Sequence, residues 1–537
     1  MSIQRRSKIL ALLLFLLWLP GCSQPAGQSG AATGTPPARP EGNTLVVGKP
    51  GDPKGLDPAD VTDAESSQIT ANLFDTLLRF KSGSAEVEPS LATEWKASPD
   101  GKTWTLKLRQ GVKFHDGTPF NAKAVVDNFE RQYVPNHPLR YPGATFSYWS
   151  DVWGGRITKI EAVDEHTVRF HLKEPIAPFL SNLAMPFFGI ASPAALKKSG
   201  RDAFKQPVGT GPFKFVEWLP GDRLVIEANQ DYWDGRPPLD RITFKPIPEN
   251  TSRQLQLERG AVQLITGLQL ENYPELSKNP AVKVAEQPGL NLGYLSFNTQ
   301  KKPLDDPKVR QALCLAVNRQ QIVDELYHGL AKVANSPVPP GIWGRKELPY
   351  EYNPEKAREL LKEAGHEGLK LEISYMSVPR TYFPEPKVIA EVLQAQWGEV
   401  GIQVDVKSRE WSSYLEALGQ GEHQVGLSGW IADNGDPDNF LYTLFDSGNV
   451  DTKRGGSNVC MYTSPEVHGL LVKAQALTDQ AERTKLYEKA QELIHQDAPC
   501  LPMVYVSQLA ASHPELEGFE LHPTGTLQLR KARWKSK

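Results

Sequence analysis

Helix and strand patterns alternate along almost the whole chain, and this alternation restricts its fold more than any other feature. Trp104, Leu106 and Leu108 alternate with polar residues, as in a half-buried strand, and a turn sequence follows at residues 115–117. Alternating helices and strands predict an α/β fold. With 537 residues the chain is too long for a single hydrophobic core, so we expect two or three domains.

The second half of the chain shows the clearest helix boundaries. Asp306-Pro307 and Asn353-Pro354 each place a capping side chain directly before proline, which is typical of a helix start. Apolar residues then recur at helical spacing, and the second of these helices is expected to end at Gly365. A third helix, with apolar residues from 388 to 400, is expected to stop at Gly401 before a strand at 402–406.

The N-terminus has the pattern of an export signal. A basic stretch at residues 1–8 leads into an apolar run at 9–18, which is too short to span a membrane. Leu19-Pro20-Gly21-Cys22 resembles the lipobox of bacterial lipoproteins, which implies that residues 1–21 are removed and that Cys22 carries a lipid. The alternative is an ordinary secretory signal followed by a chance cysteine. Residues 22–43 are rich in Gly, Pro, Ala and Ser, which predicts a flexible leash.

Charge and cysteine content exclude several functional classes. The net charge of −3 does not favour a nucleic-acid partner, and no cysteine pair has the spacing of a metal site, so no cofactor is expected. After Cys22, three cysteines remain, namely Cys314, Cys460 and Cys500. Cys314 and Cys500 fall in apolar segments and are predicted to be buried, while one disulfide remains an open alternative.

Catalytic motifs are incomplete, so we do not expect an enzyme. Residues 101–103 lack the glycine that a phosphate-binding loop needs five positions earlier, and His366-Glu367 lacks the second histidine of a zinc protease helix. The segment 426–430 does not complete a nucleophile elbow. The acidic run 433–438 does not match a calcium-binding EF-hand loop.

Several long segments resemble family 5 of the extracytoplasmic solute-binding proteins of ABC importers. These segments are residues 91–95, 100–114, 207–213, 288–298, 301–313 and 429–440. The last three are most similar to the dipeptide-binding subgroup. The resemblance implies an α/β, two-lobed periplasmic-binding-protein fold of class II, of the large peptide-binding type, with a hinge between the lobes.

The resemblance also implies a division of the chain. The first lobe is expected to comprise residues 44–78, 205–290 and 503–537, with an extra subdomain at 79–204, and the second lobe residues 291–502. The chain is expected to cross between the lobes near residues 289–298 and 501–506.

The ligand chemistry implied for the dipeptide subgroup suits two residues of this chain. A dipeptide carries an ammonium and a carboxylate, and each needs a hydrogen-bonded partner of opposite charge when it leaves water. The matching residues are Asp433 for the ammonium and Arg380, whose planar fork donates two parallel bonds, for the carboxylate.

Further site residues follow from the same resemblance, with weaker support. Tyr382, Trp411 and Trp430 are expected as aromatic walls, although they could equally belong to the core. Gly429 is expected to admit the peptide backbone, and Ser66 and Ser67 are expected at the cleft edge of the first lobe. One departure concerns the subgroup's disulfide after the acidic run, because the corresponding residues here are Ser447 and Met461.

These expectations define a lipid-anchored receptor, outside the cytoplasmic membrane, that captures dipeptides or short peptides by hinge closure. Its partners would be permease and ATPase subunits on separate chains, and the receptor itself would be a monomer. Alternatives within the family are receptors for nickel chelates, haem, glutathione, opines or longer oligopeptides. A role in sensing or as a chaperone on the same fold also stays open.

Overall fold

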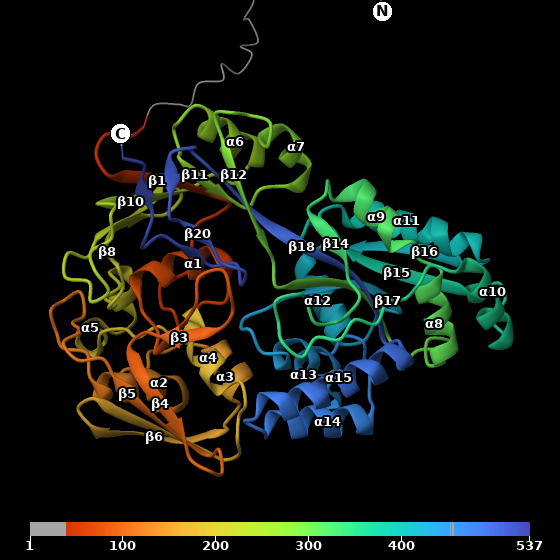
Figure 1. Ribbon diagram of the computed structural model, residues 1–537, viewed down its shortest axis with the longest axis horizontal. Helices are drawn as coiled ribbons and strands as arrows, with labels where there is room; N and C mark the ends of the chain where they lie inside the picture. The colour runs from red at the N-terminus through yellow and green to blue at the C-terminus, as the bar shows by residue number, and fades with distance from the viewer. Residues whose placement is uncertain (1–38, 452, 454–455, 537) are drawn as a thin grey trace, which may run out of the picture.

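The structure is a computed structural model that describes residues 39–451, 453 and 456–536. It is an α/β protein whose two halves lie side by side in Figure 1. The predicted signal segment, Cys22 and the leash up to residue 38 lie outside the described residues. Of the predicted leash, only residues 39–43 are described, and there Arg39 pairs with Glu515 and lies over the ring of Trp534.

Within the described residues, one sheet of 12 strands runs through both halves of the molecule, and its main path has the order β16-β15-β17-β13-β18-β11-β1-β10-β9-β8. We call the half that contains β1, β8–β12 and residues 79–204 the first lobe, and the half that contains β13–β17 the second lobe. The shared strand is β18 (Cys500–Ser512), which passes from one lobe into the other (Figure 1).

The chain crosses between the lobes at two adjacent places. Strand pairing changes from the first to the second lobe at residues 289–290, between β12 and β13, and changes back at residues 506–507 within β18. The buried Asn291 side chain joins both crossings, because its Nδ2 donates to Val506 O at 2.7 Å and its Oδ1 accepts from Val506 N at 2.9 Å. The predicted crossings lie in the same two segments, while the exact lobe boundaries stay a prediction.

The sheet strands of the first lobe are β1 (Thr44–Lys49), β8 (Phe213–Leu219), β9 (Arg223–Ala228), β10 (Arg241–Pro246), β11 (Leu264–Thr266) and β12 (Lys283–Pro288), with helices α1 (Ala64–Leu73), α6 (Asn250–Glu258) and α7 (Tyr273–Leu276). The C-terminal segment adds two strand pairs to this lobe, made from β19 (Leu516–Glu517), β20 (Glu520–Leu521), β21 (Leu527–Gln528) and β22 (Arg533–Trp534).

The second lobe contains β13 (Asn291–Phe297), β14 (Ala331–Val333), β15 (Lys370–Met376), β16 (Gln403–Arg409) and β17 (Val425–Ile431). Its helices are α8 (Pro307–Leu315), α9 (Arg319–Leu326), α10 (Pro354–Glu363), α11 (Pro386–Glu399), α12 (Trp411–Gly419), α13 (Asp438–Phe445), α14 (Pro465–Gln475) and α15 (Gln480–Asp497).

The segment 79–204, predicted as an extra subdomain, forms a layer that packs mostly around an aromatic core of its own, whereas Leu196 and Phe204 belong to the main core of the first lobe. It contains β3 (Val87–Pro89), which pairs with β2 (Leu78–Phe80), and a four-stranded sheet of β4 (Ala92–Ala97), β5 (Thr103–Leu108), β7 (Thr167–Leu172) and β6 (Ile157–Asp164). Its helices are α2 (Ala122–Tyr133), α3 (Ser147–Trp153), α4 (Phe179–Leu183) and α5 (Pro193–Ser199). In Figure 1 this layer lies beside α13–α15 of the second lobe.

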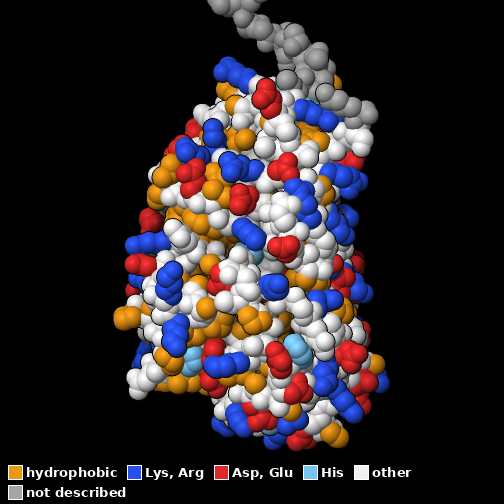
Figure 2. Space-filling model, turned by 90° about the vertical axis from the view of Figure 1, so that its left-hand side faces the viewer, with side chains coloured by type: hydrophobic (Ala, Val, Ile, Leu, Met, Phe, Trp, Pro, Cys, Tyr) orange, Lys and Arg blue, Asp and Glu red, His pale blue; other side chains and the backbone are white. Residues whose placement is uncertain are grey.

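The local predictions agree with these elements. Asp306 and Asn353 cap α8 and α10 with their side chains, and α11 is followed by Gly401 at φ 89° and then by β16. Cys314 and Cys500 are buried, as predicted, and Cys460 is buried as well; all three are free thiols. None of the helices among the described residues is long and apolar enough to cross a membrane. Figure 2 shows acidic and basic side chains interspersed on one face, without a field of a single sign.

Candidate functional site

Three parallel strands of the second lobe bring most of the predicted site residues to one edge of the sheet. β15 pairs in parallel with both β16 and β17, so the carboxyl ends of all three strands lie at the same edge. Arg380 follows β15, Trp411 follows β16, and Asp433 follows β17. In open α/β sheets, ligands bind in the crevice outside the carboxyl ends of the strands. The topology therefore places two charges that are 53 positions apart in the chain at the same edge of the sheet.

Arg380 is held by an aromatic face rather than by an acid. Its guanidinium carbon lies 3.7 Å from the centre of the Trp411 ring, which is close enough for a cation–π interaction. Its backbone N–H donates to Phe383 O at 3.0 Å, which fixes the turn that carries the side chain. Among the described residues, no carboxylate lies within ion-pair distance of Arg380, so no acidic side chain neutralises the charge of its guanidinium.

Asp433 is a partly buried carboxylate that accepts hydrogen bonds only from neutral groups in the described part of the chain. Tyr148 Oη donates to its Oδ1 at 2.9 Å, and Asn439 Nδ2 approaches its Oδ2 at 3.4 Å. Burial raises the pKa of Asp433 and the nearby Asp151 raises it further, whereas the bonds from Tyr148 and Asn439 lower it. A cation at this position would stabilise the charged form.

Trp430 and Asp433 are positioned by the same side chain. Asn439, in the first turn of α13, accepts from Trp430 Nε1 at 3.0 Å and from Asp433 N at 3.1 Å through one oxygen, Oδ1. The indole ring and the acid therefore belong to one hydrogen-bonded unit at the end of β17.

Tyr382 and Gly429 pack directly against each other. A Cβ placed on Gly429 would lie 2.4 Å from two ring carbons of Tyr382, so only glycine leaves room for this ring. Tyr382 is 7% exposed, and its backbone carbonyl accepts from the Tyr327 hydroxyl at 2.9 Å. The Tyr382 ring therefore fills the space on the Cβ side of Gly429, and the expected approach of a peptide backbone to this glycine stays a prediction.

Ser66 and Ser67 lie in the first turns of α1, and their hydroxyl groups have local partners. Ser66 Oγ donates to the N-cap residue Asp63 at 2.8 Å and accepts from Lys54 N at 2.9 Å. Ser67 Oγ donates to Ala64 O at 3.3 Å. Both residues are buried, and their contact with ligand stays a prediction. The Ser66 hydroxyl joins the N-cap residue of α1 to the backbone at Lys54.

The loop between β17 and α13 is held rigidly on the side of the second lobe. Asp436, which is 3% exposed, accepts two bonds from the Arg483 guanidinium, at 2.8 and 2.7 Å. Asn434 Oδ1 accepts from Asp436 N, and Asp436 Oδ1 accepts from Asp438 N. This network fixes the backbone of the segment that carries Asp433.

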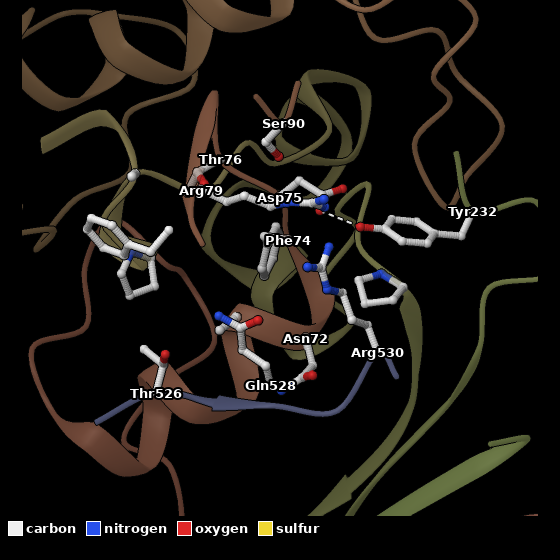
Figure 3. Close-up of a pocket in the computed structure, with 15 residues that line it drawn as sticks. Asn72, Phe74, Asp75, Thr76, Arg79, Ser90, Tyr232, Thr526, Gln528 and Arg530 are labelled. Carbon is white, nitrogen blue, oxygen red and sulfur yellow. Dashed lines mark hydrogen bonds between the residues drawn. The ribbon is translucent and has the colours of Figure 1, made fainter. Parts of the chain in front are cut away.

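Two cavities lie away from this edge. One, of about 80 Å³, is lined by Asp75, Arg79, Tyr232 and Arg530 of the first lobe (Figure 3). Its charged side chains already have partners. The Asp75 carboxylate accepts hydrogen bonds from Tyr232, Trp233 and Thr210, and both arginines form ion pairs with Asp234. The other, of about 480 Å³, is an open groove between α2 and α3. The described residues contain no cluster of three or more His, Cys, Asp or Glu side chains that could hold a metal ion.

The sequence did not indicate Tyr148 as part of the site. It lies on α3 of the first lobe, 285 positions before Asp433, and stacks on Phe187 with ring centres 3.5 Å apart. An aromatic residue in a short helix is ordinarily read as core, so only the three-dimensional structure shows its hydroxyl against the acid.

Comparison with known proteins identifies the family of this chain. Residues 86–452 match the family described as bacterial extracellular solute-binding proteins, family 5 Middle. The chain therefore belongs to this family of extracellular binding proteins, which are receptors rather than enzymes.

Particular relatives bind different solutes. The chain is 36% identical over 533 residues to haem-binding protein A of Haemophilus influenzae, covering 96% of this chain and 97% of that protein. It is 36% identical over 502 residues to the dipeptide-binding protein of Escherichia coli, covering 90% and 93%. Among solved structures, the periplasmic binding protein DppA from Helicobacter pylori in complex with the peptide STSA has a TM-score of 0.77 and 39% identity, covering 92% and 98%. The two-lobed α/β fold predicted from the sequence is confirmed by this similarity.

Proposed function

We propose that this protein captures dipeptides or other short peptides and delivers them to a membrane importer. The observation that carries the proposal is the pair of opposite charges at one sheet edge, Asp433 and Arg380, neither of which has an ionic partner among the described residues. The α-ammonium of a peptide would bind Asp433, and its carboxylate would bind Arg380.

The surroundings of each charge suit this role. The Arg380 guanidinium carbon lies 3.7 Å from the centre of the Trp411 ring, and a guanidinium held in this way can donate two parallel hydrogen bonds to a carboxylate. At the other end, Tyr148 and Asn439 already orient the Asp433 carboxylate, so an ammonium adds charge compensation without rearranging the acid. The rings of Tyr382, Trp411 and Trp430 provide apolar walls that do not select one peptide sequence.

Closure of the two lobes would complete the site. Asp433 belongs to the second lobe and its partner Tyr148 to the first, so this contact forms only when the lobes come together. The hinge would be the paired crossings at residues 289–290 and 506–507. A ligand that contacts both lobes shifts the population towards the closed form by its difference in affinity for the two forms.

The proposal is tested by isothermal titration calorimetry on the soluble body, which starts at residue 39. Dipeptides, a tetrapeptide, glutathione and haem are the probes. We expect dipeptides to bind, and Arg380→Gln to weaken dipeptides more than it weakens dipeptide amides, which lack the carboxylate. Equal losses for both ligands, or no binding of any peptide, would exclude the charge pair as the peptide site.

Haem is the second candidate, because a haem-binding relative matches this chain over almost its whole length. Haem carries two propionates and no ammonium, so it would use Arg380 but gain nothing from Asp433. Binding of haem that is insensitive to Asp433→Asn, with no binding of dipeptides, would favour this candidate over the first.

We further propose that Cys22 carries the lipid that holds the receptor at the outer side of a membrane, with separate permease and ATPase chains as its partners. The support is the lipobox-like segment at residues 19–22. In cells fed a labelled fatty acid, the full-length protein should become labelled, and Cys22→Ser should abolish the label. Labelling that persists in this variant would refute the anchor.

A further inference from the structure

The loop that carries Asp433 is also the place where the two lobes touch. Three segments of the first lobe contact three consecutive residues of this loop. Tyr148 of α3 donates to Asp433, and Asn434 Nδ2 donates to Asn182 Oδ1 of α4 at 2.7 Å. The third residue, Gly435, faces Ala85 in the turn between β2 and β3.

The contact at Gly435 leaves no room for a side chain. A Cβ on Gly435 would lie 2.4 Å from Ala85 Cβ and 2.7 Å from Ala85 O. Carbon contacts below 3 Å do not occur in real structures, so one of the two segments would have to move. The φ angle of Gly435 lies outside the left-handed region, so an alanine there meets this neighbour without backbone strain.

Neither segment can easily give way. The β2–β3 turn is braced against the C-terminal part of the first lobe, because Glu520 accepts from Ser82 Oγ at 2.7 Å and from Gly83 N at 2.5 Å. His522 Nε2 lies 2.9 Å from Ser84 O and adds a third tie. On the opposite side, the Asp436–Arg483 ion pair fixes the loop one residue beyond Gly435.

Since these contacts hold each segment to its own lobe, moving one lobe away from the other relieves the obstruction without breaking them. We propose that Gly435 is a closure residue: its missing side chain lets the first lobe seat on the Asp433 loop, and ligand affinity depends on it although it need not touch the ligand. This inference rests on the proposed function, in which lobe closure completes the peptide site.

The test compares four proteins, each made from residue 39 onwards: the wild type, Gly435→Ala, Ala85→Leu and Gly469→Ala. Ala85→Leu obstructs the same contact from the other lobe. Gly469 lies on α14 of the second lobe with no atom within 4 Å of an added Cβ, which makes Gly469→Ala a matched control. Thermal denaturation without ligand verifies that each variant is folded.

The probe ligand is Ala-Ala, measured by calorimetry, and small-angle scattering reports lobe separation with and without it. We expect Gly435→Ala and Ala85→Leu each to raise Kd at least tenfold and to remain more extended than the wild type at saturating ligand. Gly469→Ala should match the wild type in both measurements. Adding Ala85→Gly to Gly435→Ala should restore part of the affinity, because it removes the contact at Cβ but leaves the carbonyl.

Each outcome decides the inference. A Gly435→Ala variant that is folded, binds Ala-Ala like the wild type and compacts like it would overturn the closure role. If the wild type binds no peptide, the proposed function fails, and the inference, which rests on it, fails with it. A wild type that binds Ala-Ala beside an unaffected Gly435→Ala variant rejects the inference alone.

Discussion

Replacing Asp433 with asparagine should move ligand binding and protein stability in opposite directions. Asparagine has nearly the same shape and its carbonyl can still accept from Tyr148, so the substitution removes charge while leaving the contact between the lobes in place. Charge-assisted hydrogen bonds contribute about 1.5–3 kcal/mol, and breaking a buried ion pair costs about 3–5 kcal/mol. For a partly buried acid we expect a loss of about 2–3 kcal/mol, which is about a 30- to 150-fold rise in the Kd for dipeptides.

The effect on the free protein follows from the raised pKa of Asp433. Burial raises this pKa above its unfolded value, so folding favours the protonated carboxyl. The group therefore supports the folded state at pH below the ordinary range of an aspartate, and this support is lost as the pH rises through the raised pKa. At neutral pH the carboxylate opposes folding, and Asp433→Asn should raise the Tm of the ligand-free protein.

A thermal-denaturation series with and without peptide measures both effects. At a ligand concentration of 100 times the wild-type Kd, binding stabilises the wild type by about 2.7 kcal/mol, whereas a 100-fold weaker variant gains only about 0.4 kcal/mol. Tyr148→Phe is the companion variant, since it removes the hydrogen bond but keeps the charge. An Asp433→Asn protein that is less stable and binds peptide normally would refute the reasoning, because the acid would then be structural.

Four further substitutions test other parts of the molecule. Arg380→Lys keeps the charge but loses the planar fork, and we expect at least a tenfold rise in the Kd for dipeptides by calorimetry. Trp411→Ala should also raise this Kd, because it removes a cation–π contact that contributes about 0.5–2 kcal/mol. Arg483→Met leaves Asp436 buried without its partner, and the free energy of unfolding in urea should fall by about 3–5 kcal/mol. Asn291→Ala removes two hydrogen bonds between the lobe crossings. We expect amide hydrogen exchange to become faster at residues 289–291 and 504–507, while the secondary structure of the protein stays unchanged.

The controls for Arg380→Lys and Arg483→Met lie close to these residues in the chain. Lys387→Gln, on the exposed face of α11, should leave peptide affinity unchanged, and Lys485→Met, exposed on α15, should leave the free energy of unfolding unchanged. Equal effects of a control and its test variant would show that the element, rather than the named contact, determines the result.

Local sequence patterns predicted several elements of the second lobe. Proline after a capping residue located α8 and α10, and the apolar spacing located α11 and the strand β16 that follows it. The segment 429–440, which contains the end of β17 and the turn after it, came from the family resemblance. Arg380, Trp411 and Asp433 were named from the same resemblance, and in the structure each lies shortly after a strand.

Contacts between distant segments could not be predicted in this way. Tyr148 and Ala85 reach the Asp433 loop from a different lobe, and no periodicity or motif in their own segments marks them. For Gly429 the resemblance suggested an approach of ligand backbone, which stays a prediction, but it did not indicate that the Tyr382 ring packs against this glycine. In contrast, Asp63 three residues before Ser66 is a capping pattern, which would have indicated the local role of that hydroxyl.

The side chain of Asn291 couples the two crossings between the lobes. Because this buried amide belongs to one crossing segment and bonds to the other, neither segment can bend without straining both hydrogen bonds. The two crossings then act as one hinge, and an obstacle at any point of the lobe interface opposes closure of the whole interface. Under the closure role proposed for Gly435, one methyl group at the rim would limit closing for the other interface residues as well.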